Sequence, residues 1–237
     1  DWSGMTIGTF FDFNADTYSY TLGGTARDFK NIEHVIGGSG NATFIATFLG
    51  NGTSIDGGAG VDHLDLSSNA ANISVNQREF DIDNGYSFNG GAFQSMWSNL
   101  ENLTIFANVA GTVLGNSVNK VLTGSSYDDI LNGNAGRDTL MGLAGADLFI
   151  LDSNEGYDDI DGGTGVDTVD ITALNGIVFD LAGETYGVAG SAFVFDLKSI
   201  ANVTSRLANG DDVFIGSGTA NVINAGGGND RFDNVGG

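Results

Sequence analysis

The feature of this sequence that most constrains its fold is a nine-residue repeat, clearest between residues 115 and 150. The stretch GNAGRDTLMGLAGADLFI at 133–150 is one phrase written twice. It has glycine at positions 1 and 4, aspartate at position 6 and a large apolar residue at position 8. A fixed short period is the signature of a repeat architecture, in which stacked units share one core. The sequence therefore predicts a solenoid.

The repeat units fall into three blocks. The central block has four units in tandem at 115–150 and, after two further residues, two more at 153–170. A later block covers 207–233, and an earlier, weaker block covers 37–65.

Each unit divides into a turn and a strand. Its first six residues, rich in Gly and Asp, favour a tight turn with positive φ angles. Its last three residues alternate outward, inward and outward, as in a short strand. Two units, or 18 residues, would then complete one coil, and coils would stack at about 4.8 Å. The predicted inward stack is Leu122, Leu131, Leu140, Phe149, Ile160 and Val169, continued by Phe214, Ile223 and Phe232.

The best-matched units resemble a known family. GGAGVDHLD at 57–65 and GGTGVDTVD at 162–170 resemble the haemolysin-type calcium-binding repeat, GGxGxDxUx, of the RTX (repeats-in-toxin) proteins. The resemblance implies an all-β fold, a right-handed parallel β-roll or β-solenoid, with calcium held between stacked turns. Where the repeats lapse, we expect wider coils of the same solenoid.

Stacking also brings the position-6 aspartates of alternate units together. Two unit charges ~5 Å apart repel by about 0.8 kcal/mol in water and by more than ~3 kcal/mol at an effective dielectric constant of 20. A Ca²⁺ ion would remove this repulsion, because it binds carboxylate and backbone carbonyl oxygens in flexible geometry. With no cysteine and two histidines in the chain, a softer metal is a poor fit.

The register predicts which residues form the calcium sites. Asp129 should face Asp147, Asp138 should face Asp158, Asp147 should also face Asp167, and Asp212 should face Asp230 with Asn221 in the alternate turn. The expected ligands are Asp62, Asp129, Asp138, Asp147, Asp158, Asp167, Asp212 and Asp230, with Gly133, Gly136, Gly142, Gly145, Gly162, Gly165 and Gly228 in the turns. The alternative is plain turn chemistry, in which each aspartate bonds its own backbone.

Besides Asn221, three position-6 slots lack an acid. Ala42 and Thr53 fill two of them in the first block, where only Asp62 fits the pattern. Lys120 fills the third, so we expect the 115–123 turn to bind no ion.

A slower rhythm indicates three modules. The phrases NIEHV at 31–35, NLENL at 99–103 and SIANV at 199–203 each stand shortly before a repeat block. We therefore expect modules at 1–65, 66–170 and 171–237, the last of them truncated. The spacing of Phe93, Met96 or Trp97, and Leu100 predicts one or two helical turns in the second module.

Composition excludes several classes of partner. A net charge of −22, from 30 acidic and 8 basic residues, would repel nucleic acid. No apolar run approaches the ~18 residues that a membrane-spanning helix needs.

Calcium binding would also link folding to location. A ligand that binds only the folded state adds about 2.7 kcal/mol per site at 100 times its Kd, and this stabilisation would be lost in a calcium-poor cytoplasm. RTX proteins commonly leave Gram-negative bacteria through a one-step (type I) secretion channel, so the resemblance implies an extracellular or cell-surface location.

Three functions can be weighed from the sequence. The first is a structural protein of a surface layer, adhesin or extracellular matrix, with self-association or a cell-surface polysaccharide as its partner. The alternative is the calcium-binding secretion and folding module of a secreted enzyme such as a protease, lipase or alginate epimerase. A third, that the chain itself is a polysaccharide lyase or epimerase, is disfavoured because its eight basic residues form no evident catalytic constellation. We therefore expect no enzymatic activity.

Overall fold

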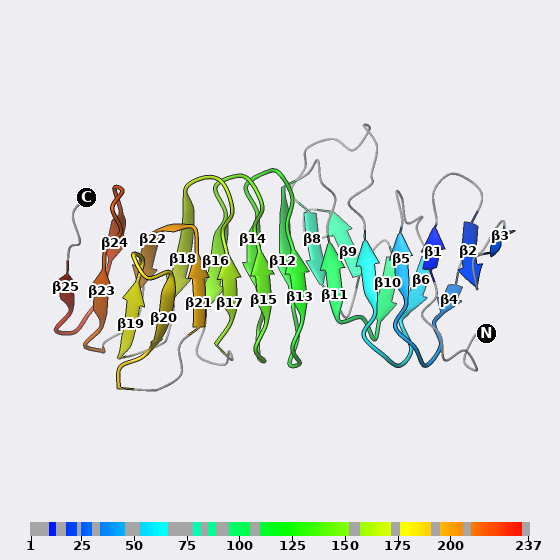
Figure 1. Ribbon diagram of the computed structural model, residues 1–237, viewed down its shortest axis with the longest axis horizontal. Coiled ribbons are helices and arrows are strands. Elements are labelled where there is room, and N and C mark those ends of the chain that lie inside the picture. The colour runs from blue at the N-terminus through cyan, green and yellow to red at the C-terminus, as the bar shows by residue number, and fades with distance from the viewer. Residues whose placement is uncertain are drawn as a thin grey trace.

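The chain forms an elongated solenoid of short strands (Figure 1). The computed structural model describes residues 10–12, 18–22, 25–29, 34–45, 53–65, 78–81, 85–88, 95–104, 110–151, 157–171, 176–190, 195–205 and 210–233. Every regular element in these ranges is a strand. Accordingly, this part of the chain has no helix long and apolar enough to cross a membrane. The predicted all-β solenoid is confirmed.

The strands form two long sheets along the solenoid axis. Sheet 1 has 14 strands, in the spatial order β25 (Arg231–Asp233), β23 (Val213–Ile215), β19 (Ile177–Asp180), β20 (Thr185–Val188), β21 (Phe195–Lys198), β17 (Asp159–Asp161), β15 (Thr139–Met141), β13 (Val121–Thr123), β11 (Asn102–Thr104), β7 (His63–Asp65), β5 (Thr43–Ile45), β1 (Phe10–Asp12), β2 (Tyr18–Leu22) and β3 (Thr25–Phe29). Sheet 2 has 11 strands: β24 (Val222–Asn224), β22 (Ile200–Ser205), β18 (Asp167–Ile171), β16 (Leu148–Leu151), β14 (Ile130–Asn132), β12 (Gly111–Leu114), β8 (Arg78–Asp81), β9 (Gly85–Phe88), β10 (Ser95–Ser98), β6 (Thr53–Asp56) and β4 (His34–Ile36).

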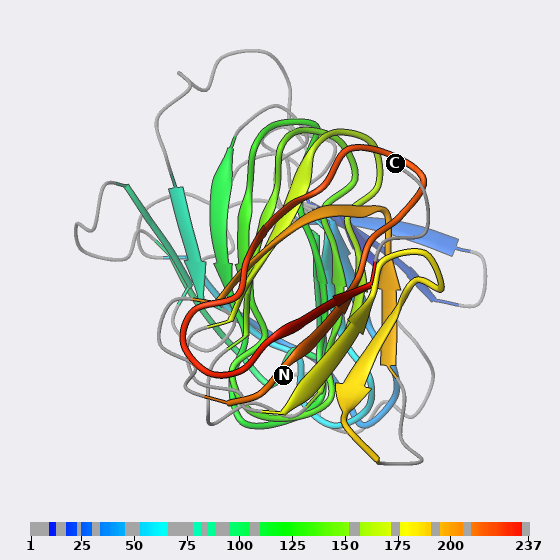
Figure 2. The ribbon, with the colours of Figure 1, turned by 90° about the vertical axis from the view of Figure 1, so that its left-hand side faces the viewer.

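In the central block, consecutive units alternate between the two sheets. Leu122 of β13 lies opposite Leu140 of β15 in sheet 1, and Leu131 of β14 lies opposite Phe149 of β16 in sheet 2. Both pairs are parallel and are 18 residues apart. Two nonapeptides therefore make one coil, as predicted, and Figure 2 shows these coils superimposed as an oval when viewed along the axis.

The position-8 residues form the core of the roll. The side chains of Leu122, Leu131, Leu140, Phe149, Ile160, Val169 and Phe214 are at most 1% exposed, which confirms the predicted stack over these units. Phe232 continues the stack, because its ring lies against that of Phe214, but it is 56% exposed. Its strand, β25, is the last of sheet 1, so only one side of the ring has a neighbouring strand. Ile223 is partly buried against the core.

The segments that precede each repeat block add strands to the sheets. Each forms a three-stranded antiparallel meander within a sheet: β1–β2–β3, β8–β9–β10 and β19–β20–β21. In the last of these, β19 pairs in parallel with β23 and β21 pairs in parallel with β17. The meander is thus inserted into the parallel stack. The helical turns predicted near Met96 and Trp97 were wrong, because these residues pair in parallel with β6 as strand β10.

Stacked aromatic rings form the core at the third meander, β19–β20–β21. Tyr186 stacks on Phe179 with ring centroids 5.6 Å apart, Phe179 stacks on Phe214 at 5.7 Å, and Phe214 stacks on Phe232 at 5.5 Å. Phe179 and Tyr186 thus fill the interior where the nine-residue pattern lapses, and they join the core to the position-8 rings of the last block. The division into three modules remains a prediction.

Candidate metal sites

The six-residue turns are built as the composition predicted. The carboxamide or carboxylate at position 9 accepts a hydrogen bond from the backbone N–H two residues later, as Asn132 does from Asn134 at 2.7 Å and Asp161 from Gly163 at 3.1 Å. The position-4 glycines have positive φ angles: 131° at Gly136, 130° at Gly145, 148° at Gly165 and 127° at Gly228. This left-handed backbone is readily available only to glycine. The turns are therefore tight and stack directly on one another.

Stacked turns place the position-6 residues in rows, one before each sheet. The backbone N–H of Asp129 donates to Oδ1 of Asp147 at 2.8 Å, and that of Asp147 donates to Oδ1 of Asp167 at 2.9 Å. The same bond links Asp138 to Asp158 at 2.8 Å and Asp212 to Asp230 at 3.1 Å. All four predicted pairs thus lie together.

In each carboxylate of this ladder, Oδ1 accepts a hydrogen bond from the neighbouring coil, which leaves Oδ2 for another partner. Among the described residues, Oδ2 has no hydrogen-bond partner in five buried aspartates, namely Asp62, Asp138, Asp147, Asp158 and Asp167. All five side chains are at most 1% exposed. A buried anionic oxygen without a partner is strongly unfavourable. These oxygens therefore need a proton or a cation.

The position-1 glycines leave room for that cation. A Cβ atom at Gly133 would overlap Oδ2 of Asp138 and lie 2.8 Å from Oδ2 of Asp158. At Gly142, the added atom would overlap Oδ2 of Asp147 and lie 2.8 Å from the carbonyl oxygen of Gly162. A Cβ atom at Gly162 would likewise lie 2.7 Å from Oδ2 of Asp167. Carboxylate and carbonyl oxygens thus converge on the same point in successive turns.

Burial also shifts the protonation of these acids. It raises the pKa of Asp147 and of Asp158 to about 7, and that of Asp62, Asp129 and Asp138 to about 6. The neighbouring carboxylates add to the effect, since Asp129 and Asp167 raise the pKa of Asp147 further. Desolvation likewise raises the pKa of Asp167 and Asp212. A nearby divalent cation would favour the ionised forms instead.

The remaining candidate aspartates differ in their surroundings. Both carboxylate oxygens of Asp129 accept a hydrogen bond at 2.6 Å, Oδ1 from the Gly111 N–H and Oδ2 from the Ser125 N–H. The second bond lies within the turn itself, as the plain turn-chemistry alternative predicted, whereas the first joins neighbouring coils. Asp129 therefore combines a turn bond with a bond between coils. Asp230 belongs to the last coil and is only partly buried. The first block contributes Asp62, whose Oδ1 accepts from the Ala42 N–H at 2.6 Å.

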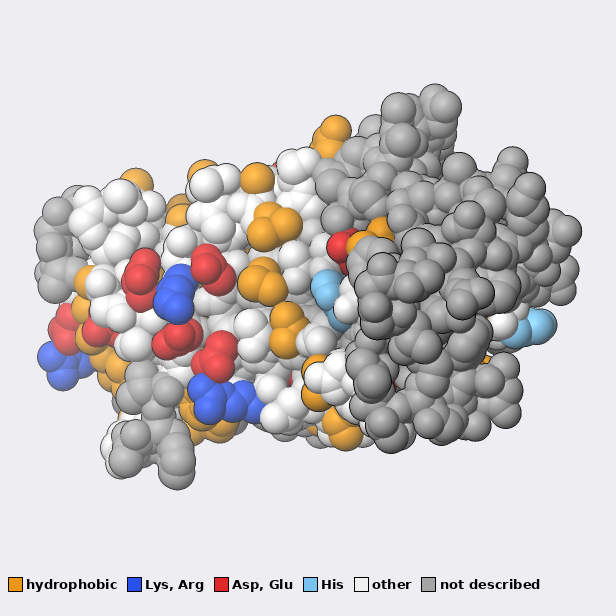
Figure 3. All heavy atoms as spheres, turned by 45° about the vertical axis from the view of Figure 1, so that its right-hand side comes forward, with side chains coloured by type: hydrophobic (Ala, Val, Ile, Leu, Met, Phe, Trp, Pro, Cys, Tyr) orange, Lys and Arg blue, Asp and Glu red, His pale blue; other side chains and the backbone are white. Residues whose placement is uncertain are grey.

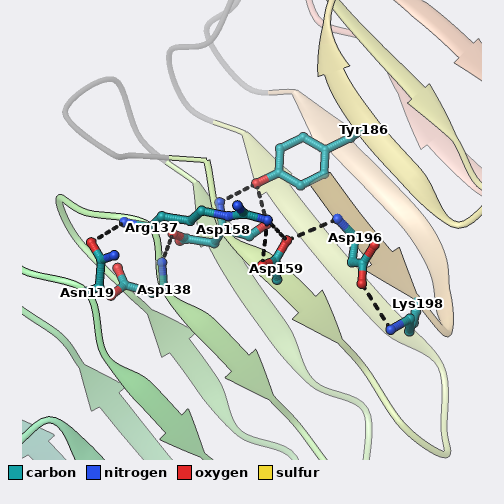
Figure 4. A network of polar contacts seen from close by, with 8 residues as sticks. All are labelled: Asn119, Arg137, Asp138, Asp158, Asp159, Tyr186, Asp196 and Lys198. Atoms are coloured by element: carbon teal, nitrogen blue, oxygen red, sulfur yellow. Dashed lines mark hydrogen bonds and ion pairs between the residues drawn. The ribbon is translucent and has the colours of Figure 1, made fainter. Parts of the chain in front are cut away.

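Two residues outside the nine-residue pattern also belong to the rows. Oε2 of Glu101 accepts a hydrogen bond from the Asp62 N–H at 2.8 Å, as an aspartate would. The hydroxyl of Tyr186 accepts from the Asp158 N–H at 2.6 Å and donates to the Asp158 carbonyl at 2.8 Å (Figure 4). Glu101 lies in the recurring phrase NLENL, which stands shortly before a repeat block. No sequence signal marks Tyr186, which reaches the row from a meander strand.

The donor set fits a hard cation. Among the described residues, no group of three or more His, Cys, Asp and Glu side chains is placed to hold a metal ion. A cation here would therefore combine one or two carboxylates with the backbone carbonyls of the turns. All of these ligands are oxygens, which suits Ca²⁺ and not a soft metal.

Comparison with known protein families finds the RTX calcium-binding nonapeptide repeat (4 copies) at residues 115–149 and 208–237. The chain carries RTX-type calcium-binding repeats. The RTX matches include Asp129, Asp138, Asp147, Asp212 and Asp230, and they leave out the units that contain Asp62, Asp158 and Asp167. No curated protein matches the chain significantly.

Proposed function

We propose that this chain is a secreted structural solenoid whose coils are held together by calcium. The observation that carries the proposal is the row of buried aspartates whose Oδ2 atoms have no hydrogen-bond partner among the described residues. The RTX repeats support calcium as the cation. In this proposal the roll is stable only where calcium is plentiful.

The residues that would hold calcium come from adjacent turns on the same side of the roll. Before sheet 1, Asp138 and Asp158 would bind it together with turn carbonyls. Before sheet 2, Asp147 and Asp167 would do so with the carbonyl of Gly162, which lies beside Gly142 as Oδ2 of Asp147 does. The bound ion would supply positive charge between carboxylates that otherwise repel each other.

The dependence on calcium supports a location outside the cell. Each site adds binding free energy to folding only when the ion is abundant, so the chain would stay largely unfolded in a calcium-poor cytoplasm. Export as an unfolded chain followed by folding outside the cell agrees with this behaviour. The net charge of −22 adds self-repulsion to the apo chain.

We propose a structural role in a surface layer, adhesin or extracellular matrix, without catalysis by this chain. The buried aspartates support this role, because their Oδ1 atoms accept hydrogen bonds from backbone N–H groups and their Oδ2 atoms lie against the position-1 glycines of the turns. Carboxylates enclosed in this way join coils to each other. They are not presented to a substrate.

Calcium titration followed by far-ultraviolet circular dichroism tests the calcium-dependent fold. The chain in EDTA should lack most of its strand signal, and Ca²⁺ should restore it at concentrations where Mg²⁺ does not. Equal strand content in EDTA and in saturating calcium would contradict the proposal.

The structural role has a separate test. Multi-angle light scattering with calcium should show assemblies larger than one chain, or binding to cell-surface polysaccharide, and EDTA should reverse either. A holoprotein that stays monomeric at high concentration and binds no polysaccharide would favour the alternative, a calcium-binding module of a secreted enzyme.

A further inference from the structure

Lys120 is a buried cation within the acidic row that precedes sheet 1. Its side chain is 3% exposed, whereas Arg137, Lys198 and Arg231 lie at the surface, each paired with an aspartate. Figure 3 shows such basic side chains beside acidic ones on one face of the molecule. The Lys120 backbone N–H donates to Oδ1 of Asp138 at 2.6 Å, so the residue occupies an ordinary position in the ladder.

The Lys120 ammonium points toward the preceding coil. Its Nζ atom donates to the carbonyl oxygen of Leu100 and lies 3.7 Å from Oε1 of Glu101. Glu101 is the residue that takes an aspartate's place beside Asp62. A fixed positive charge therefore lies beside the Glu101 carboxylate, whereas the next positions of this row, Asp138 and Asp158, have only carboxylate oxygens.

In the coil that Lys120 contacts, a short connection, here called a corner, replaces the six-residue turn between two strands. A second corner occurs later in the chain. Strands β10 and β11 are joined through Asn99, which has a φ angle of 52°, and β21 and β22 are joined through Ser199, with a φ angle of 57°. Both corners stack on the repeat units that best match the consensus. The Gly57 N–H donates to the Ser98 carbonyl at 2.9 Å, and the Gly162 N–H donates to the Lys198 carbonyl at 3.0 Å.

Asn221 also donates to a backbone carbonyl of a corner, at the second of the two corners. Its Nδ2 atom donates to the carbonyl oxygen of Ala201 at 2.9 Å. By strand register Asn221 lies beside Ala201, whereas Lys120 lies beside Glu101 and donates to the carbonyl of the residue before it, Leu100. The Oδ1 atom of Asn221 accepts from the Ser217 N–H at 2.8 Å, the bond that Asp129 makes with Ser125. In both cases a hydrogen-bond donor occupies position 6 of the repeat unit whose strand pairs with the strand that follows the corner, β13 with β11 and β24 with β22.

A hydrogen-bond donor at position 6 makes the turn a poorer site for calcium. Calcium needs oxygen lone pairs, and here the position-6 side chain presents an N–H donor that takes one lone pair of a carbonyl oxygen at the corner. At Lys120 the ammonium also balances the charge of Glu101, so no ion is needed for electroneutrality. At Asn221 the side chain is neutral and adds no carboxylate charge to attract an ion.

We propose that Lys120 and Asn221 are built-in substitutes for calcium at the two corners that join successive repeat blocks. This inference rests on the proposed calcium-dependent function. The two residues limit the number of ions that each row of position-6 residues binds. Each supplies a donor in place of a carboxylate at the point where one repeat block meets the next. They also keep the junctions formed when calcium is scarce, so that a partly unloaded chain retains contacts between its blocks.

The number of calcium ions bound per chain tests the proposal. Lys120→Asp and Asn221→Asp each supply the missing carboxylate and remove the donor, so each variant should bind one more ion than the wild type in isothermal titration. Lys120→Met removes the donor without adding a ligand and should bind the wild-type number. Lys198→Asp repeats the charge change at an exposed site and should also leave the number unchanged.

The outcomes separate this inference from the proposed function. A wild type that binds no calcium contradicts both. A wild type that binds calcium, with folded Lys120→Asp and Asn221→Asp variants that gain no ion, contradicts the inference alone. If Lys120→Asp does not fold in calcium, the nearly isosteric Asn221→Asp decides the question.

Hydrogen exchange in low calcium gives a second readout. Amides of β11 and β13, which pair beside Lys120, should exchange about tenfold faster or more in Lys120→Met than in the wild type. The amides of β16 and β18 should be unaffected. Equal exchange of β11 and β13 in both proteins would overturn the claim that the lysine maintains the junction.

Discussion

The backbone N–H of Asp138 donates to Oδ1 of Asp158 at 2.8 Å, and the Oδ2 atoms of both carboxylates are directed toward Gly133. One oxygen of Asp158 thus fixes the stacking of two coils while the other remains available for a ligand. The nine-residue period repeats this relationship along the roll. The same residues therefore set the register and create the need for a cation.

Replacing these aspartates by asparagine should weaken calcium binding according to position. Asp147 has a carboxylate neighbour on both sides, Asp129 and Asp167, whereas Asp138 faces Asp158 on one side and Lys120 on the other. Asp147→Asn should weaken calcium binding by about tenfold or more, and Asp138→Asn by less. Isothermal titration of both variants measures the difference.

Asp128→Asn is the matched control for that comparison. Asp128 is exposed, and its Oδ1 accepts from the Ala146 N–H at 2.7 Å in a similar bond between coils. Calcium affinity should change by less than about threefold in this variant. Equal effects at Asp128 and Asp147 would mean that the buried row does not bind the ion.

Mild acid should partly replace calcium. Burial raises the pKa of Asp147 and Asp158 from 3.8 to about 7, so their protonated forms favour the folded state. Without calcium, this stabilisation is fully present below the unfolded pKa and is lost as the pH rises through about 7. The chain in EDTA should therefore have more strand signal at about pH 5 than at about pH 7.5.

Calcium affinity should show the opposite pH dependence, because protons compete for the same oxygens. It should fall as the pH drops through about 7 to 6, the range of the raised values. The double variant Asp147→Asn, Asp158→Asn should flatten the pH dependence of the strand signal in EDTA. An unchanged pH profile in that variant would assign the effect to the other acids.

The cavity at the position-1 glycines can be tested by a single methyl group. Gly142→Ala places a Cβ atom against Oδ2 of Asp147, whereas Gly218→Ala has no atom within 4 Å of the added carbon. Neither glycine has a positive φ angle, so the comparison isolates steric overlap. Urea unfolding in calcium should show a loss of about 1–3 kcal/mol for Gly142→Ala and a change within about 0.5 kcal/mol for Gly218→Ala.

The interior stack should be most sensitive at its centre. Phe149 is fully buried between coils, and Phe232 is 56% exposed on the last strand. Phe149→Ala should lower the free energy of unfolding in calcium by about 3–5 kcal/mol. Phe232→Ala should lower it by about 1 kcal/mol. Similar losses at the two positions would show that the chain buries Phe232 in solution.

The sequence predicted the features that depend on the nine-residue period. Because side-chain direction alternates along a strand, Leu140 had to point inward once the period was known, and Asp138 had to reach Asp158 across one coil. The structure has both relationships. The role of the aspartates as calcium ligands remains a proposal.

Most features that the sequence did not predict lie outside the period, and the exposure of Phe232 depends on its place in the last described coil. Tyr186 reaches the row from a meander, and its spacing to Asp158 follows from an antiparallel excursion that no local pattern encodes. Met96 and Trp97 have helical spacing but pair in parallel with β6, where sheet hydrogen bonding overrides the local pattern. Phe232 fits the inward pattern and lacks a further coil within the described ranges to cover it.

The most direct test of the central claim is a crystal structure grown in calcium, with anomalous diffraction used to locate the ions. Anomalous peaks are expected between adjacent turns, within bonding distance of Oδ2 of Asp138, Asp147, Asp158 and Asp167, and none is expected beside Lys120. Well-ordered turns over 124–170 without such peaks would contradict the account.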